Sequence, residues 1–170
     1  MAGGLRRAVL PALALAAGLL GPAGAWAEQW GGIDPGATTI EQVRARYGAP
    51  SKETRAKTEG YDTIQWVYEA ERAPIGLRRM TVDYGLLTSP GYKPTVVRVL
   101  RLEPKPKIFG RNTVVEAFGV PDGVSTQHSQ DRFFYRAGLV VIFDKEGDDA
   151  VMLDFVLAQP DKPASAAPKR

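Results

Sequence analysis

The chain has 170 residues and a formal net charge of +3, and its basic excess lies near the two ends. Residues 28–159 carry 17 basic and 18 acidic side chains, so a generally cationic surface that binds nucleic acid is not expected. The absence of cysteine excludes disulfides, cysteine-ligated metals, thiol catalysis and lipid attachment to an N-terminal cysteine.

The first 27 residues have the composition of a cleavable signal peptide. Arg6 and Arg7 give a positively charged start, and the 13 residues of Ala8–Leu20 form an apolar run. Ala25-Trp26-Ala27 matches the pattern that precedes signal cleavage, which places the cut between Ala27 and Glu28. The run is shorter than the roughly 20 residues that cross a bilayer, so we expect a mature chain without a membrane span. The expected location is the periplasm or the exterior, and the paired arginines leave a twin-arginine export route open.

A short helix is predicted to begin at Thr38, which has the spacing of a capping box with Glu41. The apolar residues that follow recur on one helical face: Ile40, Val43 and Tyr47. Gly48 ends this helix, and Pro50 prevents its continuation.

Three strands are predicted to follow the helix. Apolar side chains alternate with polar ones in three segments, Tyr61–Glu69, Met80–Tyr84 and Val96–Leu102. Such alternation is typical of strands with one face on a core. The polar segment before the first strand and the turn-rich segment 85–94 are predicted to be loops.

A similar order of elements recurs from Gly110 onward. A second helix is predicted to end at Gly119-Val120-Pro121, just as the first ends at Gly48-Ala49-Pro50. Three further strands are predicted at residues 132–136, 139–143 and 151–157. The polar segment 144–149 between the last two is predicted to be a hairpin turn.

Matched aromatic residues support this comparison of the two stretches. Trp66 and Tyr68 in the first stretch correspond to Phe133 and Tyr135 in the second. Their alternation favours packing in the core between helix and sheet. The alternative is an aromatic contact surface, because exposed aromatic residues carry much of the binding energy of many interfaces.

These patterns predict an α+β fold of two tandem units, each a helix followed by a three-stranded antiparallel meander. The helices are expected to pack on one sheet face and to leave the other face open. The predicted boundaries are a signal peptide at 1–27, a first unit at 28–104, a second, shorter unit at 105–159, and a disordered Pro/Ala-rich tail at 160–170.

The first stretch also carries a longer pattern: Ile33-x-x-Gly36-x-Thr38-x-x-x-Gln42-Val43-x-x-x-Tyr47-Gly48-x-Pro50, followed by Trp66-x-Tyr68. This pattern resembles the SmpA/OmlA family of outer-membrane assembly proteins, the BamE-like group. The resemblance implies a short helical region packed on a three-stranded antiparallel sheet. A tandem pair of such units is similar to the β-lactamase inhibitor proteins, whose broad sheet surface grips a target enzyme. The implied function is protein binding or envelope assembly.

No catalytic, cofactor-binding or metal-binding pattern stands out in the sequence. His128 is the only histidine and lies in a polar stretch, and the acidic segment 144–149 lacks the glycine position of a calcium-binding EF-hand loop. We therefore predict no cofactor, no metal and no catalytic residue. A small envelope hydrolase stays open as the alternative, because active sites assemble from residues far apart in sequence.

The middle of the chain has an unusual charge. Between Arg72 and Arg111, nine basic residues stand against two acidic ones, whereas residues 112–159 hold three basic and eight acidic residues. The candidate partner-binding residues are Arg78, Arg79, Arg98 and Arg101, in or beside two neighbouring predicted strands. A cationic open face favours an acidic protein partner, such as an envelope or outer-membrane protein, or contact with anionic lipid. The alternative is a solvated sheet face that discourages edge pairing.

The sequence thus leads to one main hypothesis, a soluble and non-catalytic protein-binding or envelope-assembly module in the periplasm. Nucleic acid is not an expected partner of an exported chain with this charge balance. The sequence makes no prediction of oligomeric state.

Overall fold

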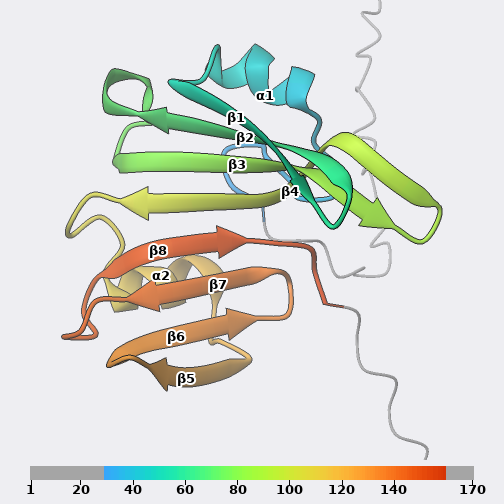
Figure 1. Ribbon diagram of the computed structural model, residues 1–170. Helices are drawn as coiled ribbons and strands as arrows, with labels where there is room; N and C mark the ends of the chain where they lie inside the picture. Colours follow the sequence, from blue (N-terminus) through green and yellow to red (C-terminus); the bar gives the residue numbers. More distant parts are fainter. Residues whose placement is uncertain (1–28, 160–170) are drawn as a thin grey trace, which may run out of the picture.

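The computed structural model describes residues 29–159, which form one antiparallel sheet and two short α-helices (Figure 1). The strands lie in the order β1-β2-β3-β4-β8-β7-β6-β5 across the sheet. In chain order the elements are α1 (Ile40–Tyr47), β1 (Lys52–Thr58), β2 (Tyr61–Glu69), the 3₁₀ turn η1 (Ala70–Arg72), β3 (Leu77–Thr88), β4 (Gly91–Pro104), α2 (Arg111–Phe118), β5 (Gly123–Gln127), β6 (Gln130–Tyr135), β7 (Leu139–Phe143) and β8 (Ala150–Phe155). The predicted signal peptide, its cleavage point between Ala27 and Glu28, and the predicted tail at 160–170 lie outside the described residues.

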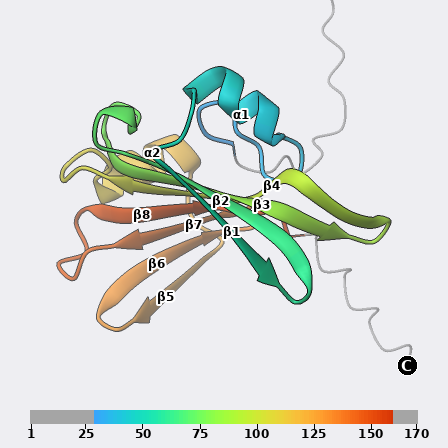
Figure 2. The same ribbon diagram turned by 45° about the horizontal axis from the view of Figure 1, so that its top comes forward.

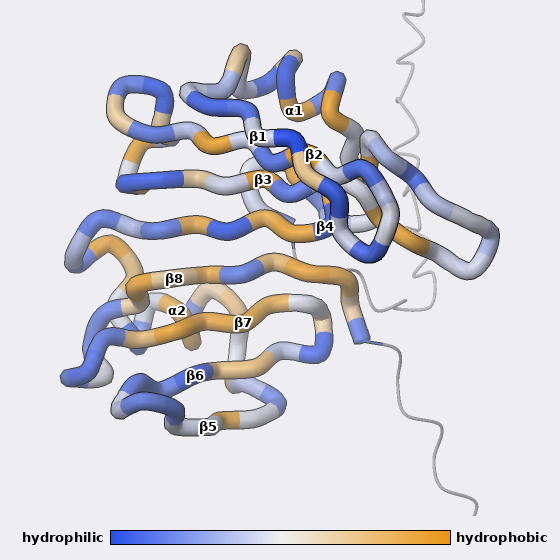
Figure 3. The backbone as a smooth tube through the Cα atoms, in the orientation of Figure 1, coloured by the Kyte–Doolittle hydropathy of each residue, from blue (hydrophilic) through white to orange (hydrophobic). Residues whose placement is uncertain are grey.

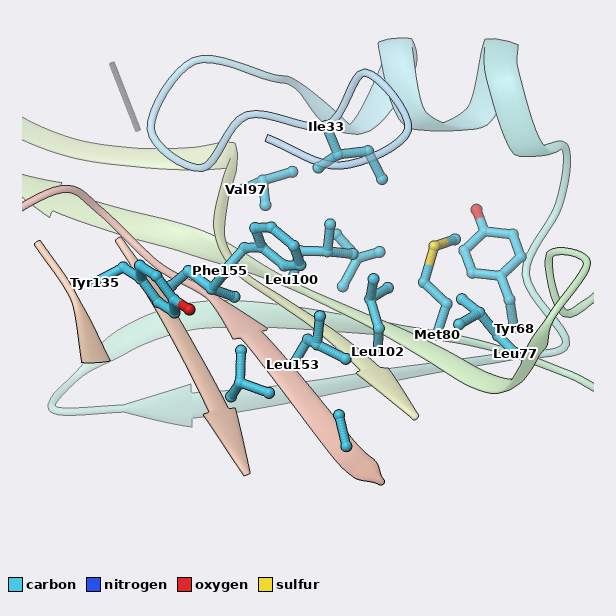
Figure 4. Packing of buried hydrophobic residues seen from close by; sticks show 14 of the residues in the cluster. Ile33, Tyr68, Leu77, Met80, Val97, Leu100, Leu102, Tyr135, Leu153 and Phe155 are labelled. Carbon is cyan, nitrogen blue, oxygen red and sulfur yellow. The ribbon is translucent and has the colours of Figure 1, made fainter. Parts of the chain in front are cut away.

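The core lies on one face of the sheet, beneath the two helices. Because side chains alternate along each strand, paired residues form apolar rows that run across the sheet from β2 to β6. The two rows are Trp66, Val82, Leu100, Phe155, Leu139 and Tyr135, and Tyr68, Met80, Leu102, Leu153, Val141 and Phe133. Every one of these side chains is buried, and Val43 of α1 and Val114 of α2 join the same cluster. Figure 4 shows Leu100, Leu102, Leu153 and Phe155 packed together where β4 meets β8.

The two helices begin and end much as the sequence suggests. The α1 helix has Thr39 as its N-cap, with the Thr39 N–H donating to Gln42 Oε1 at 2.8 Å, so the predicted cap at Thr38 was one residue early. The Thr38 hydroxyl instead accepts a hydrogen bond from the Asp34 N–H at 2.9 Å. Gly48 and Gly119 end α1 and α2 with φ of 75° and 82°, a backbone conformation that favours glycine. No helix within residues 29–159 has the length and apolar composition to cross a membrane.

A tyrosine hydroxyl from the sheet donates a hydrogen bond to the carbonyl at the end of each helix. Tyr68 Oη of β2 donates to the Gly48 carbonyl at 3.1 Å, and Tyr135 Oη of β6 donates to the Gly119 carbonyl at 3.1 Å. Burial raises the pKa of Tyr68 to about 12, so its hydroxyl stays protonated and remains a donor at neutral pH. The carbonyl groups at helix ends lack partners within the helix, and these hydroxyls satisfy two of them.

We expect Tyr68→Phe to lower the free energy of unfolding by about 1 kcal/mol, because it leaves the Gly48 carbonyl without its donor. Tyr84→Phe is the matched control: Tyr84 is also fully buried, but its hydroxyl has no hydrogen-bond partner among the described residues. Removing that unpaired hydroxyl is expected to leave stability unchanged or to raise it. Urea unfolding of the two variants measures both effects, and an equal loss in both would contradict the assignment.

The fold-class prediction of two tandem three-stranded units was wrong. All eight strands belong to one continuous sheet, in which β4 pairs with β8 through Leu100–Phe155, Arg101–Asp154 and Leu102–Leu153. Each helix is followed by four strands and not three, and the helices are only eight residues long. The chain is therefore a sheet-dominated protein and not a pair of helix–meander units.

The missing strands are the two edges of the sheet, β1 and β5. Every side chain of β1 is exposed, and β5 is exposed along nearly its whole length. A strand without a buried face shows no alternation of apolar and polar residues, and Figure 3 shows β1 as mostly hydrophilic. The segment 85–94, predicted to be a loop, instead continues β3 to Thr88 and begins β4 at Gly91.

Candidate functional site: the open face of the sheet

The face of the sheet opposite the core is the broadest surface that the fold leaves uncovered. A row of paired residues crosses it through every strand: Lys52, Val67, Thr81, Arg101, Asp154, Val140, Phe134 and Gly123. We call this side of the sheet the open face. Figure 2 shows α1 and α2 together on the other side, and neither helix covers the open face.

Two of the predicted arginines, Arg78 and Arg79 on β3, share one carboxylate. Arg79 pairs with Glu69 at 3.1 Å and with Glu103 at 3.3 Å, and Arg78 lies 3.6 Å from Glu103. The hydrogen bond to Glu69 and the charge of Glu103 raise the pKa of Arg79. Arg78, Arg79 and Glu69 are well exposed, so the pairs contribute little to stability. They nevertheless neutralise much of the positive charge expected here.

Arg101 is neutralised across the junction of β4 and β8. Its Nε lies 2.8 Å from Asp154 Oδ1, and the hydrogen bond to Asp154 is the main cause of its raised pKa. Asp154 belongs to the acidic part of the chain and Arg101 to the basic part. The opposite charges of the two sequence stretches thus meet inside one molecule.

Arg98, the fourth predicted arginine, differs from the other three. Its Nε is shielded from solvent and has no hydrogen-bond partner within residues 29–159. No carboxylate of the described chain lies within ion-pair distance of it, whereas Arg78, Arg79 and Arg101 each have one.

Two adjoining hollows mark the open face over strands β1 to β4. The first has a volume of about 270 Å³ and is lined by Thr54, Ala56, Thr58, Thr63, Ile64, Gln65, Asp83 and Arg98. The second has a volume of about 320 Å³ and is lined by Lys52, Gln65, Val67, Glu69, Arg79, Thr81, Arg101 and Glu103. Gln65 lines both hollows and donates from Nε2 to Asp83 Oδ1 at 2.8 Å. The hollows are polar and hold charges of both signs.

The open face carries an apolar patch over strands β6 to β8, beside Arg132 and Asp154, and the sequence-based prediction missed it. Phe134 is 39% exposed there, and Val140, Ile142 and Met152 are partly exposed beside it. The available signal was the unbroken apolar run Leu139–Phe143, since a strand of which only one face is buried usually alternates. The open face therefore combines a charged half with an apolar half.

The described residues show no convergent catalytic group. Within residues 29–159, no three His, Asp or Glu side chains are placed to hold a metal ion. Hydrogen bonds from Arg55 and Thr126 lower the pKa values of Glu53 and Asp131, and burial raises the pKa of Asp34; these groups lie on β1, on β6 and before α1. His128 lies in the tight turn between β5 and β6 with a positive φ of 53°.

The aromatic residues singled out in the sequence belong to the core. Trp66 is 2% exposed and Tyr68, Phe133 and Tyr135 are also buried, so the core interpretation is confirmed and the contact-surface alternative is wrong. The Trp66 indole N–H donates to Glu53 Oε2 at 2.8 Å. Phe134, the neighbour of Phe133 and Tyr135, is an aromatic side chain on the open face.

No protein-family model matches the chain, and no curated protein matches it in sequence. Among solved structures, the chain is similar to the crystal structure of a DUF4309 family protein, YjgB, from Bacillus subtilis subsp. subtilis str. 168. The two chains are 12% identical, the similarity covers 76% of this chain and 85% of the other, and the TM-score is 0.50. What they share is a fold.

This similarity and the continuous sheet overturn the predicted resemblance. The assignment to the SmpA/OmlA, BamE-like family was wrong, and so was the comparison with tandem inhibitor-like units. The pattern that suggested it consists of a helix cap, a glycine-proline helix end and alternating core aromatics. Each of these elements satisfies a local requirement of a helix next to a sheet, so together they do not specify one fold.

Proposed function

We propose that this protein is a non-catalytic module of the cell envelope that binds another protein on the open face of its sheet. The observation that carries the proposal is the uncovered face itself, charged over β2 to β4 and apolar over β6 to β8. Interfaces between proteins commonly combine an apolar patch with surrounding polar groups. Export to the periplasm or beyond follows from the signal peptide predicted at residues 1–27.

The distribution of charge favours a protein partner. Arg79 and Arg101 alternate with Glu69, Glu103 and Asp154, so the charged half presents closely spaced charges of both signs. Such a surface selects a partner with a complementary pattern, whereas a nucleic acid or a uniformly anionic polymer meets repulsion from the carboxylates. No grouping of side chains within residues 29–159 favours the alternative of a hydrolase.

Site-specific photo-crosslinking in an envelope extract tests the proposal. A photoreactive amino acid at Met152 on the open face is expected to capture a discrete protein partner, because a bound partner covers that side chain. Raising the salt is expected to reduce the yield, since the Debye length falls from about 8 Å at physiological ionic strength to about 3 Å at 1 M.

The matched control carries the same photoreactive group at Glu116, an exposed position of α2 on the opposite side of the molecule. This variant is expected to capture nothing discrete. Equal products from both positions, or none from Met152, would contradict the open face as the binding surface.

A further inference from the structure

Arg98 owes its place on the open face to an irregularity of strand pairing. Asp83 pairs with Val99 and the next residue, Tyr84, pairs with Val97, which leaves Arg98 as an extra residue of β4. Leu102 and Leu100 point into the core, so strict alternation of side chains along β4 would also place residue 98 in the core. The bulge gives that buried position to Val97 and directs Arg98 into the polar hollow. Bulges often re-aim a side chain in this way next to binding sites.

The hollow around Arg98 is lined by polar residues and by one acidic residue, Asp83, whose carboxylate is already hydrogen-bonded. Thr54 and Thr58 of the edge strand are among the residues that line it. Asp83, its acidic residue, accepts a hydrogen bond from Gln65 at 2.8 Å and does not pair with Arg98. The shielded Arg98 Nε–H has no acceptor within residues 29–159, which is costly for a donor out of contact with water, and the Arg98 side chain lines the hollow.

We propose that the hollow formed by Arg98, Thr54 and Thr58 binds one carboxylate group, from an acidic side chain of the partner protein. The inference rests on the proposed function and names the group that the charged half recognises. A guanidinium and a carboxylate match in charge and in planar geometry, which gives a directed charge-assisted contact. Arg78, Arg79 and Arg101 already have carboxylates within this molecule, so among the four predicted arginines Arg98 is left to recognise one from outside. The Arg132 Nε is also shielded and unpaired, but Arg132 does not line this hollow.

The surroundings favour a single protein carboxylate over a lipid surface. Glu69 and Glu103 line the adjoining hollow, and Asp83 lines the Arg98 hollow itself. An array of lipid phosphates would bring many negative charges against these carboxylates. One acidic side chain entering between them avoids most of this repulsion.

Nuclear magnetic resonance of the arginine Nε–Hε groups tests the inference on the isolated protein. Titration with sodium propionate, which carries a single carboxylate, is expected to shift the Arg98 signal to saturation. The Arg101 signal is not expected to shift, because the Arg101 guanidinium is already hydrogen-bonded to Asp154. Propionamide, the neutral analogue, is expected to shift neither signal. Inorganic phosphate and phosphatidylglycerol vesicles, titrated separately, represent the lipid source.

Two substitutions provide the matched comparison. Arg98→Lys keeps the charge but loses the shielded N–H, and is expected to bind propionate about tenfold more weakly, the loss of one charge-assisted hydrogen bond. Arg98→Gln is expected to abolish binding, whereas Arg101→Gln, with the same change in net charge on the same strand, retains it. If propionate shifts both arginines alike or neither, or if phosphate or vesicles bind while propionate does not, the inference is overturned.

The photo-crosslinking experiment separates this inference from the proposed function. Crosslinking from Met152 is expected to be lost in Arg98→Gln and kept in Arg55→Gln, which makes the same change in net charge on the side of the sheet beside α1, where Arg55 pairs with Glu53. Equal capture with both variants would overturn the role of Arg98 and leave the open face as a binding surface. No capture by the unsubstituted chain would count against the proposed function, and the propionate titration would still decide whether the hollow binds a carboxylate.

Discussion

Replacing Trp66 with alanine is expected to lower the free energy of unfolding by about 3–5 kcal/mol, the range for removing a large aromatic side chain from a core. Trp66 is 2% exposed and sits in the apolar row with Val82 and Leu100. Its ring packs edge-on against Tyr84, with ring centres 5.2 Å apart, and the Arg44 guanidinium lies 5.2 Å from the ring centre. The substitution removes all of these contacts and leaves a cavity. Chemical denaturation followed by circular dichroism measures the loss.

Phe134→Ala is the matched aromatic control, because Phe134 is 39% exposed on the opposite face of the sheet. Its stability is expected to fall by less than about 1.5 kcal/mol, in proportion to its smaller buried area. Its crosslinking to the partner is expected to weaken, since Phe134 belongs to the apolar half of the open face. An unchanged melting temperature in Trp66→Ala would contradict the packing described for the core.

Gly138→Ala is expected to destabilise the protein by at least about 3 kcal/mol, through backbone strain and a steric overlap that add together. Gly138 has a φ of 99°, which disfavours any residue with a Cβ atom, and it connects β6 to β7. A Cβ atom here would overlap the Val156 carbonyl oxygen and approach the Ala158 nitrogen to 3.0 Å. Since both neighbours are backbone atoms, no side-chain rotation relieves the overlap.

Gly119→Ala is the control that measures the loss of stability caused by backbone strain without a steric overlap. Gly119 has a similar φ of 82°, but a Cβ atom there has no neighbour within 4 Å. Its expected cost is about 1–2 kcal/mol, from the left-handed conformation alone. Thermal unfolding of both variants provides the comparison, and a loss in Gly138→Ala no larger than in Gly119→Ala would show that the overlap is relieved.

The parts of the fold that the sequence predicts well are those with one buried face. The ends of both helices follow from Gly48 and Gly119, and strands β2 and β6 follow from the alternation around Trp66 and Phe133. The edge strands β1 and β5 escape prediction because their side chains are exposed and their pattern matches that of a polar loop. Pairing of β4 with β8 also escapes it, since this contact joins residues more than 50 positions apart.

The candidate site shows the same division. Arg79 lies next to buried Met80 in β3, so alternation alone places its side chain opposite the core. The partner of Arg101, Asp154, depends on which strand lies beside β4, and a local pattern contains no such information. Arg98 reaches the open face only because of the bulge next to the Asp83–Val99 pair. A bulge of one residue is hard to predict from sequence when the bulged position is not a glycine.

One of the two central strands of the sheet, β8, is also the last strand within residues 29–159. Until β8 (Ala150–Phe155) is available, β4 and β7 have no partner on their facing edges, and Leu100, Leu102 and Val141 lack their neighbours in the core. A nascent chain emerging from the ribosome therefore holds two incomplete half-sheets until β8 follows them. For a protein with a predicted export signal, this order of completion delays the final cooperative folding step and favours an unfolded, translocation-competent chain.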